Sequence, residues 1–142
     1  MAELSLVLDA DGVTALLRKA FPDAEPPFFP RVHDLSPGRI HMISPFREQM
    51  LRPGRLISGP VQMSLADNAA YALVLAHIGD QLMAVTSTMT ANFLRGCPPG
   101  DIHVEGELLR LGRRMAVCDM RIWTEAPDRL AAQASVTYAI PS

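Results

Sequence analysis

Two residues of types that can take part in catalysis lie in the stretch RLISGPVQMSLADN, residues 55–68. Gly59 comes just before an apolar segment, and Asp67 is a carboxylate within that segment. The first N–H groups of a helix have no intrahelical partner and carry partial positive charge, so the Gly59 N–H can stabilise an oxyanion. A carboxylate in apolar surroundings suits a general base. The plain alternatives are a glycine that only makes a turn and a buried structural aspartate.

The segment that carries these residues is expected to be one long helix. Pro60 suits the first helical position and Gly79 follows the last turn, which frames a helix of about 19 residues. Apolar residues occur on every side, so the helix is expected to be buried. Ser58 is expected to cap it or to contact a ligand. Asn68 is expected either to line a pocket or to make a polar contact between subunits.

The rest of the chain consists mainly of predicted β-strands. Turn sequences and alternating polarity predict strands near residues 31–35, 39–46, 84–94, 102–111, 115–124 and 130–140. Short turns separate the last three, so these are expected to form an antiparallel meander. A slip in the alternation near Leu108 and Leu109 indicates a bulge.

The N-terminal part is expected to be an accessory element. Asp11 can cap a helix from about Gly12 to Ala20, which Pro22 ends. Residues 22–30 (PDAEPPFFP) are expected to be an irregular linker. The chain is therefore predicted to be one domain over 1–142, with a helix and linker in 1–29 and a core in 30–142. The economical core is an α+β fold in which a curled antiparallel sheet wraps around the long helix.

Composition excludes several classes of function. The chain has 142 residues, 49% hydrophobic and 20% charged, with a net charge of −2. Nothing here indicates a nucleic-acid or membrane partner. Cys97 and Cys118 lack metal-binding spacing, so no metal is expected. The N-terminus does not read as a signal peptide, and the protein is expected to be soluble and cytoplasmic.

An ordered set of motifs carries a family resemblance. The motifs are Ser58-Gly59-Pro60 with Leu65-Ala66-Asp67, Asn92-Phe93-Leu94-Arg95, Pro99-Gly100-Asp101 and Gly112-Arg113-Arg114. From about residue 30 to 140 the chain resembles hotdog-fold acyl-CoA thioesterases of the phenylacetyl-CoA thioesterase-like (PaaI-type) family. The resemblance implies the hotdog fold, an acyl-CoA substrate, no cofactor beyond the coenzyme A of that substrate, and a homodimer or tetramer with active sites at the dimer interface.

The same resemblance assigns roles to residues. Asp67 falls on the catalytic acid, and Gly59 on the glycine whose N–H polarises the thioester carbonyl. An assisting hydroxyl falls on Thr86 or Ser87. Along one helix Gly59 and Asp67 are about 12 Å apart, so the working pair is expected to come from different subunits. Whether Asp67 acts as general base or as nucleophile stays open, as does the acyl group.

Other residues are candidates for substrate binding. Coenzyme A carries phosphate charges that arginine binds well, which favours a nucleotide site formed by the group Arg95, Arg110, Arg113 and Arg114, although each taken alone reads as a solvated side chain. Thr86, Thr88 and Thr90 are expected on one strand face, where one of them can support a water molecule or all can simply face solvent.

The chain departs from the family pattern at three positions. Ser58 stands where histidine is usual, Pro60 where glycine is usual, and Arg52 where some relatives have asparagine. These departures motivate an alternative, a non-hydrolytic protein of the same fold that binds acyl-CoA or lipid. A hotdog dehydratase or hydratase is a further alternative, but those enzymes usually pair a histidine with the acid, and none lies near Asp67 in the motif.

Overall fold

A computed structural model describes residues 3–24 and 30–142. Along the chain the elements are α1 (Ala10–Ala20), β1 (Arg31–Ser36), β2 (Arg39–Ser44), the 3₁₀ helix η2 (Glu48–Met50), β3 (Leu51–Arg52), β4 (Leu56–Ile57), α2 (Gly59–Ile78), β5 (Val85–Phe93), β6 (Ile102–Leu111), β7 (Met115–Trp123) and β8 (Ala132–Ala139). Every strand expected from the sequence is present, and β3 and β4 form an additional short hairpin before α2.

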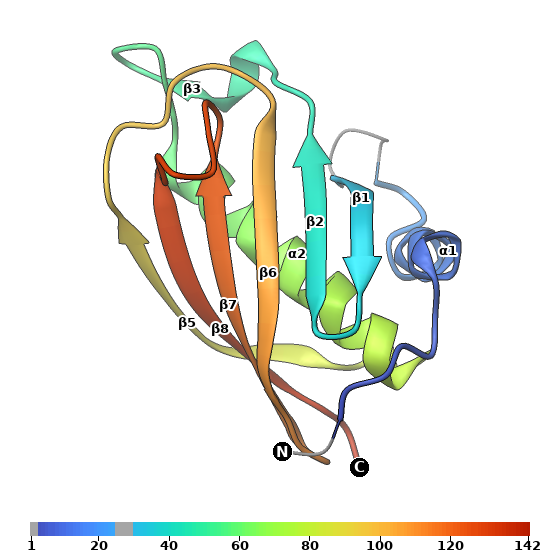
Figure 1. Cartoon of the computed structure of the whole chain (residues 1–142). Helices are drawn as coiled ribbons and strands as arrows, with labels where there is room; N and C mark the ends of the chain where they lie inside the picture. The colour runs from blue at the N-terminus through green and yellow to red at the C-terminus, as the bar shows by residue number, and fades with distance from the viewer. Residues whose placement is uncertain (1–2, 25–29) are drawn as a thin grey trace.

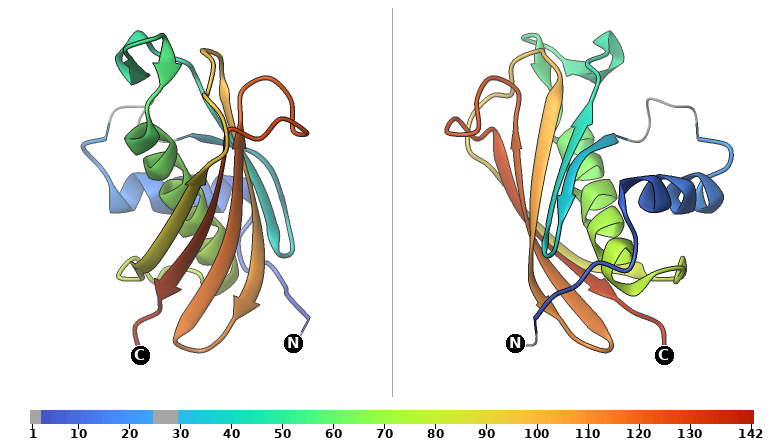
Figure 2. Two further views of the ribbon diagram at one scale, coloured as in Figure 1. Left: turned by 90° about the vertical axis from the view of Figure 1, so that its left-hand side faces the viewer. Right: turned by 45° about the vertical axis from the view of Figure 1, so that its right-hand side comes forward.

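One antiparallel sheet surrounds the long helix. Its strand order is β1-β2-β6-β7-β8-β5, with β6, β7 and β8 forming the expected meander. The strand β5 follows α2 and pairs with β8 at the far edge. Figure 1 and the two views of Figure 2 show the sheet curling around α2, with α1 outside the sheet near β1. The predicted curled sheet around one helix is therefore confirmed.

The C-terminal half of α2 is largely apolar and is buried on all sides, from Ala69 to His77. Leu73, Val74 and Leu75 show no exposed surface, and as consecutive residues they point in different directions around the helix. Alanine at many positions favours the helical conformation and lets the sheet approach closely. The first half of the helix is less enclosed, because Met63 and Ser64 are exposed and Asp67 is half-buried.

Both ends of α2 are fixed by local residues. Ser58 is the N-cap, and its Oγ accepts a hydrogen bond from the Val61 N–H at 3.4 Å. Gly79 ends the helix with φ 82°, in the left-handed region that favours glycine. The helix begins at Gly59, so Pro60 occupies its second position rather than the predicted first.

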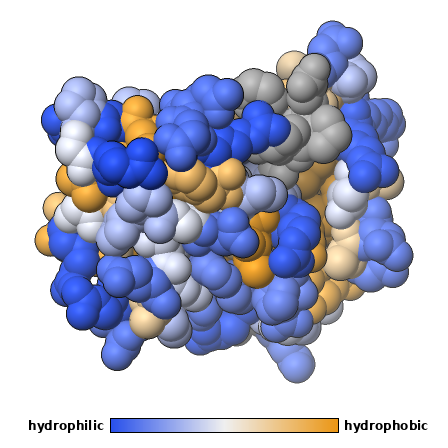
Figure 3. Space-filling view, turned by 90° about the horizontal axis from the view of Figure 1, so that it is seen from above, coloured by the Kyte–Doolittle hydropathy of each residue, from blue (hydrophilic) through white to orange (hydrophobic). Residues whose placement is uncertain are grey.

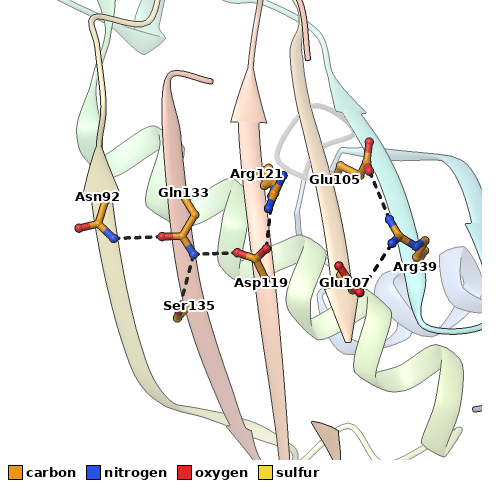
Figure 4. A network of polar contacts seen from close by, with 8 residues as sticks. All are labelled: Arg39, Asn92, Glu105, Glu107, Asp119, Arg121, Gln133 and Ser135. Atoms are coloured by element: carbon orange, nitrogen blue, oxygen red, sulfur yellow. Dashed lines mark hydrogen bonds and ion pairs between the residues drawn. The ribbon is translucent and has the colours of Figure 1, made fainter. Parts of the chain in front are cut away.

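The two faces of the sheet differ in polarity. The inward residues are small or apolar side chains that pack on α2: Ala116, Cys118, Met120 and Ile122 of β7, and Ala132, Ala134, Val136 and Tyr138 of β8. The outward face carries a polar network across five strands (Figure 4). There Gln133 donates to Asp119 at 2.7 Å, and Arg39 lies within ion-pair distance of Glu105 and Glu107. The inner face of these strands therefore packs on α2, and the outer face meets solvent.

The N-terminal helix starts earlier than expected. Its N-cap is Asp9, whose side chain accepts from the Gly12 N–H at 2.8 Å, so the prediction that Asp11 caps it was wrong. Asp11 lies in the first turn instead, where its charge favours the helix dipole. The helix packs against α2 and β1 and ends at Ala20. The predicted linker at residues 22–30 falls largely on 25–29, which lie outside the described residues.

Three strands carry register shifts, of which the sequence predicted one. The expected bulge in β6 is confirmed between Leu108 and Arg110. A second shift lies between Val32 and Asp34 in β1, and a third between Thr86 and Thr88 in β5. A bulge places an extra residue in one strand and reverses the facing of all residues beyond it. The bulge in β5 affects the candidate site directly.

The edge strand β5 is exposed along most of its length. Apolar side chains reach the surface near its start at Met83 and Val85, and at its end at Phe93 and Leu94. Figure 3 shows the molecule from above, where hydrophobic patches interrupt a largely hydrophilic surface. In the described residues, no helix has the length and apolar character needed to cross a membrane.

Candidate active site

Asp67 lies two turns into α2 and meets two hydroxyl groups. Thr86 Oγ1 donates to Asp67 Oδ1 at 2.6 Å, and the Tyr138 hydroxyl donates to the same oxygen at 2.8 Å. Within residues 3–24 and 30–142, the other oxygen, Oδ2, accepts no hydrogen bond. Hydrogen bonds of this length to a carboxylate are charge-assisted and hold it in one orientation. The site therefore contains an oriented carboxylate with one free oxygen.

A cavity of about 440 Å³ adjoins this carboxylate. It lies between α2, the end of α1 and the start of β5, and its lining combines aromatic, aliphatic and polar side chains: Phe21, Asp67, Asn68, Tyr71, Leu82, Ala84, Val85, Thr86 and Tyr138. A mostly apolar hollow with a few convergent polar groups is the usual form of a small-molecule site.

The β5 bulge explains why Thr86 faces Asp67. Thr86 pairs with Tyr138, whereas Thr88 pairs with the neighbouring Thr137, so Ser87 is the extra residue. Adjacent residues of β8 face opposite sides of the sheet, so Thr86 and Thr88 do as well. The prediction that Thr86, Thr88 and Thr90 share one face was wrong. Of the two hydroxyl candidates, Thr86 contacts Asp67, and Ser87 lies at the exposed bulge.

Three aromatic rings form one wall of the cavity. Tyr71 stacks on Tyr138 with ring centroids 5.7 Å apart, and Phe21 meets Tyr71 edge-on at 6.0 Å. The Tyr71 hydroxyl donates to the Leu82 carbonyl at 2.9 Å, which fastens the loop before β5. The predicted site omitted Tyr138 and Phe21. The available signal for Tyr138 was a phenol hydroxyl on the otherwise apolar inward face of the last strand, where a buried hydroxyl needs a partner.

The second candidate group lies at the start of α2. In the described part of the chain the Gly59 N–H makes no hydrogen bond, while the Val61 N–H is engaged by Ser58. A Cβ atom built on Gly59 would lie 3.3 Å from the Phe93 ring, so the ring packs directly on this glycine. Gly59 thus presents a free donor beside an aromatic ring. The flanking Pro60 is exposed and has no N–H to offer.

The structure does not bring Gly59 and Asp67 of one chain together. They are separated by about 12 Å of helix. Each contacts a different end of β5, because Gly59 packs on Phe93 and Asp67 on Thr86. One chain therefore holds the two halves of the predicted site at opposite ends of an exposed edge strand.

The candidate arginines also divide between the two ends of β5. Arg95 follows the end of β5, whereas Arg113 and Arg114 form the β6–β7 hairpin. That hairpin lies beside the start of β5, since Met115 pairs with Ala139, which in turn pairs with Val85. A second cavity, of about 500 Å³, lies there and is lined by Arg113 and Arg114. The expected single cluster of arginines is thus two separate groups within one chain.

Three histidines that look scattered in the sequence meet on the outer face of the sheet. His41 Nε2 and His103 Nδ1 are 2.9 Å apart, and the His33 ring lies 4.8 Å from that of His41. Burial, reinforced by the neighbouring imidazoles, lowers the pKa of His41, and burial also lowers the pKa of His103. The cluster faces away from α2 and Asp67, so it is not part of this site. His77 is structural, with its ring held between the Gly38 N–H and the Leu73 carbonyl.

Comparison with known proteins gives a family for this geometry. Residues 54–131 match the thioesterase superfamily. A crystal structure of a proposed thioesterase from Silicibacter sp. TM1040 has 37% sequence identity and a TM-score of 0.88, and the match covers 99% of this chain and 96% of that one. A search of curated proteins finds no match. The chain belongs to the thioesterase superfamily.

More distant structures agree on the fold. Zebrafish thioesterase superfamily member 2 has 20% identity and a TM-score of 0.78, and the match covers 94% of this chain and 99% of that one. A thioesterase of Haemophilus influenzae has 16% identity and a TM-score of 0.80, and the match covers 99% and 96%. The chain has the hotdog fold of thioesterases, and its family membership supports a thioesterase activity in general terms.

Proposed function

We propose that the protein is an acyl-CoA thioesterase with Asp67 as its catalytic carboxylate. The observation that carries the proposal is the Asp67 carboxylate, fixed by two hydroxyls through Oδ1 and free at Oδ2 beside a cavity of about 440 Å³. Thioester hydrolysis needs a group that activates water or attacks the carbonyl itself, and an oriented carboxylate can do either. Family membership favours this reaction over other uses of the same group.

Both chemical routes begin with the thioester carbonyl receiving a hydrogen bond from a Gly59 N–H. In the general-base route Asp67 takes a proton from water, hydroxide adds to the carbonyl carbon, and the C–S bond breaks as the thiolate leaves and is protonated. In the nucleophilic route Asp67 attacks first, coenzyme A leaves, and water cleaves the resulting anhydride. Single-turnover hydrolysis in ¹⁸O-labelled water separates them, because the label enters the Asp67 side chain only if Asp67 attacks directly.

A homodimer joined at β5 would complete this site. An exposed edge strand can pair with a second copy of itself, and a two-fold axis makes that pairing antiparallel. A two-fold axis midway between Thr86 and Phe93 would set Thr86 opposite Phe93 of the partner subunit. Because Asp67 contacts Thr86 and Gly59 contacts Phe93 in one chain, this register would bring Asp67 to Gly59 of the partner subunit. The active site would then lie between subunits.

The same dimer suggests where coenzyme A binds. The cavity lined by Arg113 and Arg114 lies at the start of β5, near the Asp67 end of the strand. Pairing at β5 would bring Arg95 of the partner subunit toward that end. Guanidinium groups bind phosphates through paired hydrogen bonds, so these three arginines are proposed to hold the nucleotide. Ser58, Pro60, Asn68 and Ser87 are proposed to contact the rest of the substrate.

A thiol-trapping assay over a panel of acyl-CoA esters, varied in chain length and including aryl-acyl groups, tests the proposal. We expect release of free coenzyme A from at least one class of ester. The alternative, a protein that binds acyl-CoA without cleaving it, predicts binding by calorimetry with no thiol release from any ester. Binding without thiol release would contradict the proposed reaction and support the binding function. The departures from the family pattern at Ser58 and Arg52 are what motivate this alternative.

A further inference from the structure

The buried tyrosine of β8 has no assigned role in the proposed reaction, yet it touches the proposed catalytic carboxylate. Tyr138 is 3% exposed, faces the inner side of the sheet and lies one residue before the end of β8. Its hydroxyl is 2.8 Å from Asp67 Oδ1 and 3.2 Å from the Asp67 backbone carbonyl. A phenol has one proton, so the shorter contact to the charged oxygen takes the hydrogen bond. The donor is therefore a buried side chain on a strand that is paired on both sides, with β7 and β5.

The protonation state of Tyr138 suits a donor. Burial raises the pKa of the Tyr138 phenol, so it keeps its proton at neutral pH. Thr86 supplies the second hydroxyl, and its single proton is committed to Asp67 Oδ1 at 2.6 Å. With both protons directed at one oxygen, neither hydroxyl has a proton left to donate to a water molecule or to a substrate carbonyl.

We propose that Tyr138 is a positioning residue that, together with Thr86, occupies Asp67 Oδ1 and thereby presents Oδ2 as the reacting oxygen. The inference rests on the proposed thioesterase function, which it extends by naming the oxygen that acts. The two donors reach Asp67 from β8 and β5, and Thr86 is directly paired with Tyr138 across those strands. The carboxylate is thus held from the sheet rather than by neighbours on its own helix.

A purely structural role for Tyr138 makes a different prediction. In that case its ring would matter through stacking on Tyr71, and its hydroxyl would only satisfy a buried polar group. Tyr138→Phe keeps the ring and removes the hydroxyl. Tyr71→Phe removes a hydroxyl from the same stack but leaves both donors on Asp67, because the Tyr71 hydroxyl bonds to Leu82 instead. This pair of variants separates positioning from packing.

The kinetic test compares these variants on the best ester of the panel. Tyr138→Phe is expected to lower kcat about 10- to 100-fold with KM little changed, since a misplaced catalytic group costs rate rather than binding. A kcat of Tyr138→Phe within about twofold of wild type would overturn the proposal.

A second readout does not depend on turnover. With ¹³C-labelled aspartate, the Asp67 Cγ resonance can be assigned by its loss in Asp67→Asn and compared between variants at one pH. Tyr138→Phe should shift that resonance, whereas Tyr71→Phe should leave it in place. A shift without any thiol release by the wild type would support the positioning role and contradict the proposed hydrolysis. An unshifted resonance in Tyr138→Phe would overturn the positioning role whatever the activity.

Discussion

Thr86 Oγ1 lies 2.6 Å from Asp67 Oδ1, a contact that depends on a single bulge in the edge strand β5. The extra residue, Ser87, reverses the facing of β5, so Thr86 points to α2 while Thr88 points to the outer side of the sheet. A regular strand with the same residues would place its threonines on one face. The local irregularity of β5 is therefore what gives the proposed catalytic carboxylate its second donor.

The two threonines provide a matched pair of substitutions. Thr86→Val removes a charge-assisted hydrogen bond to Asp67 and is expected to lower kcat about 10-fold, the equivalent of about 1.5 kcal/mol. Thr88→Val makes the same chemical change two residues away on the other face and should keep kcat near wild type. Steady-state kinetics of both variants decide the matter, and equal losses in the two would refute the assignment of Thr86.

We expect that adding a methyl group at Gly59 leaves the fold intact but lowers kcat. A Cβ at this position would lie 3.3 Å from the Phe93 ring, which is 49% exposed and can move by a few tenths of an ångström. We expect Gly59→Ala to change Tm by no more than about 2 °C and to lower kcat several-fold, because the displaced ring crowds the donor N–H. Adding Phe93→Leu should restore part of the rate. A fully active Gly59→Ala enzyme would argue against this N–H as the carbonyl donor.

Mixed dimers test whether the site is shared between subunits. Gly59→Pro removes the N–H at a position where proline is compatible with a helix start, and Asp67→Asn removes the acid. A dimer with one subunit of each kind, purified through two different tags, retains one intact site if Asp67 works with Gly59 of the partner subunit. It should recover about half of the wild-type rate per dimer. Activity no higher than that of the parent variants would show that the site lies within one subunit, and a monomer in light scattering would contradict the dimer itself.

The histidine cluster on the outer face predicts a pH dependence of stability. The pKa values of His41 and His103 lie below the ordinary 6.5 in the folded protein, chiefly because of burial. The unfolded chain therefore binds these protons more readily, so the free energy of unfolding should be greatest above pH 6.5 and fall as the pH drops below it. Urea unfolding between pH 5 and 8 measures this slope, which we expect to be shallower in a His41→Asn/His103→Asn variant. An identical slope in that variant would exclude the cluster as the cause.

The sequence was informative wherever local patterns determine structure. The Ser58 cap, the end of α2 at Gly79 and the bulge after Leu108 all follow from neighbouring residues, and the structure confirms them. The cap of α1 was misassigned because Asp9 and Asp11 are both acceptable cap residues ahead of the same apolar positions. In the structure the Asp9 side chain accepts a hydrogen bond from the Gly12 N–H, which identifies Asp9 as the cap.

Features that depend on strand pairing could not be predicted in the same way. The Tyr138 contact with Asp67 joins residues that are 71 positions apart, and it requires the register of β8 beside β5. The meeting of His41 with His103 likewise depends on the pairing of β2 with β6. Arg95 and Arg113 lie near opposite ends of β5, so their separation follows from how that strand pairs with β8.

The most direct measurement for the central claim is thiol release by Asp67→Asn beside that of Asp119→Asn. Both variants replace an aspartate by its neutral isostere, but Asp119 lies in the outer polar network, bonded to Gln133 and Arg121 (Figure 4). With the preferred acyl-CoA, Asp67→Asn should lose at least about 100-fold in kcat while keeping its fold by circular dichroism, and Asp119→Asn should stay near wild type. Full activity of Asp67→Asn against every ester in the panel would contradict the proposal that Asp67 carries out the chemistry.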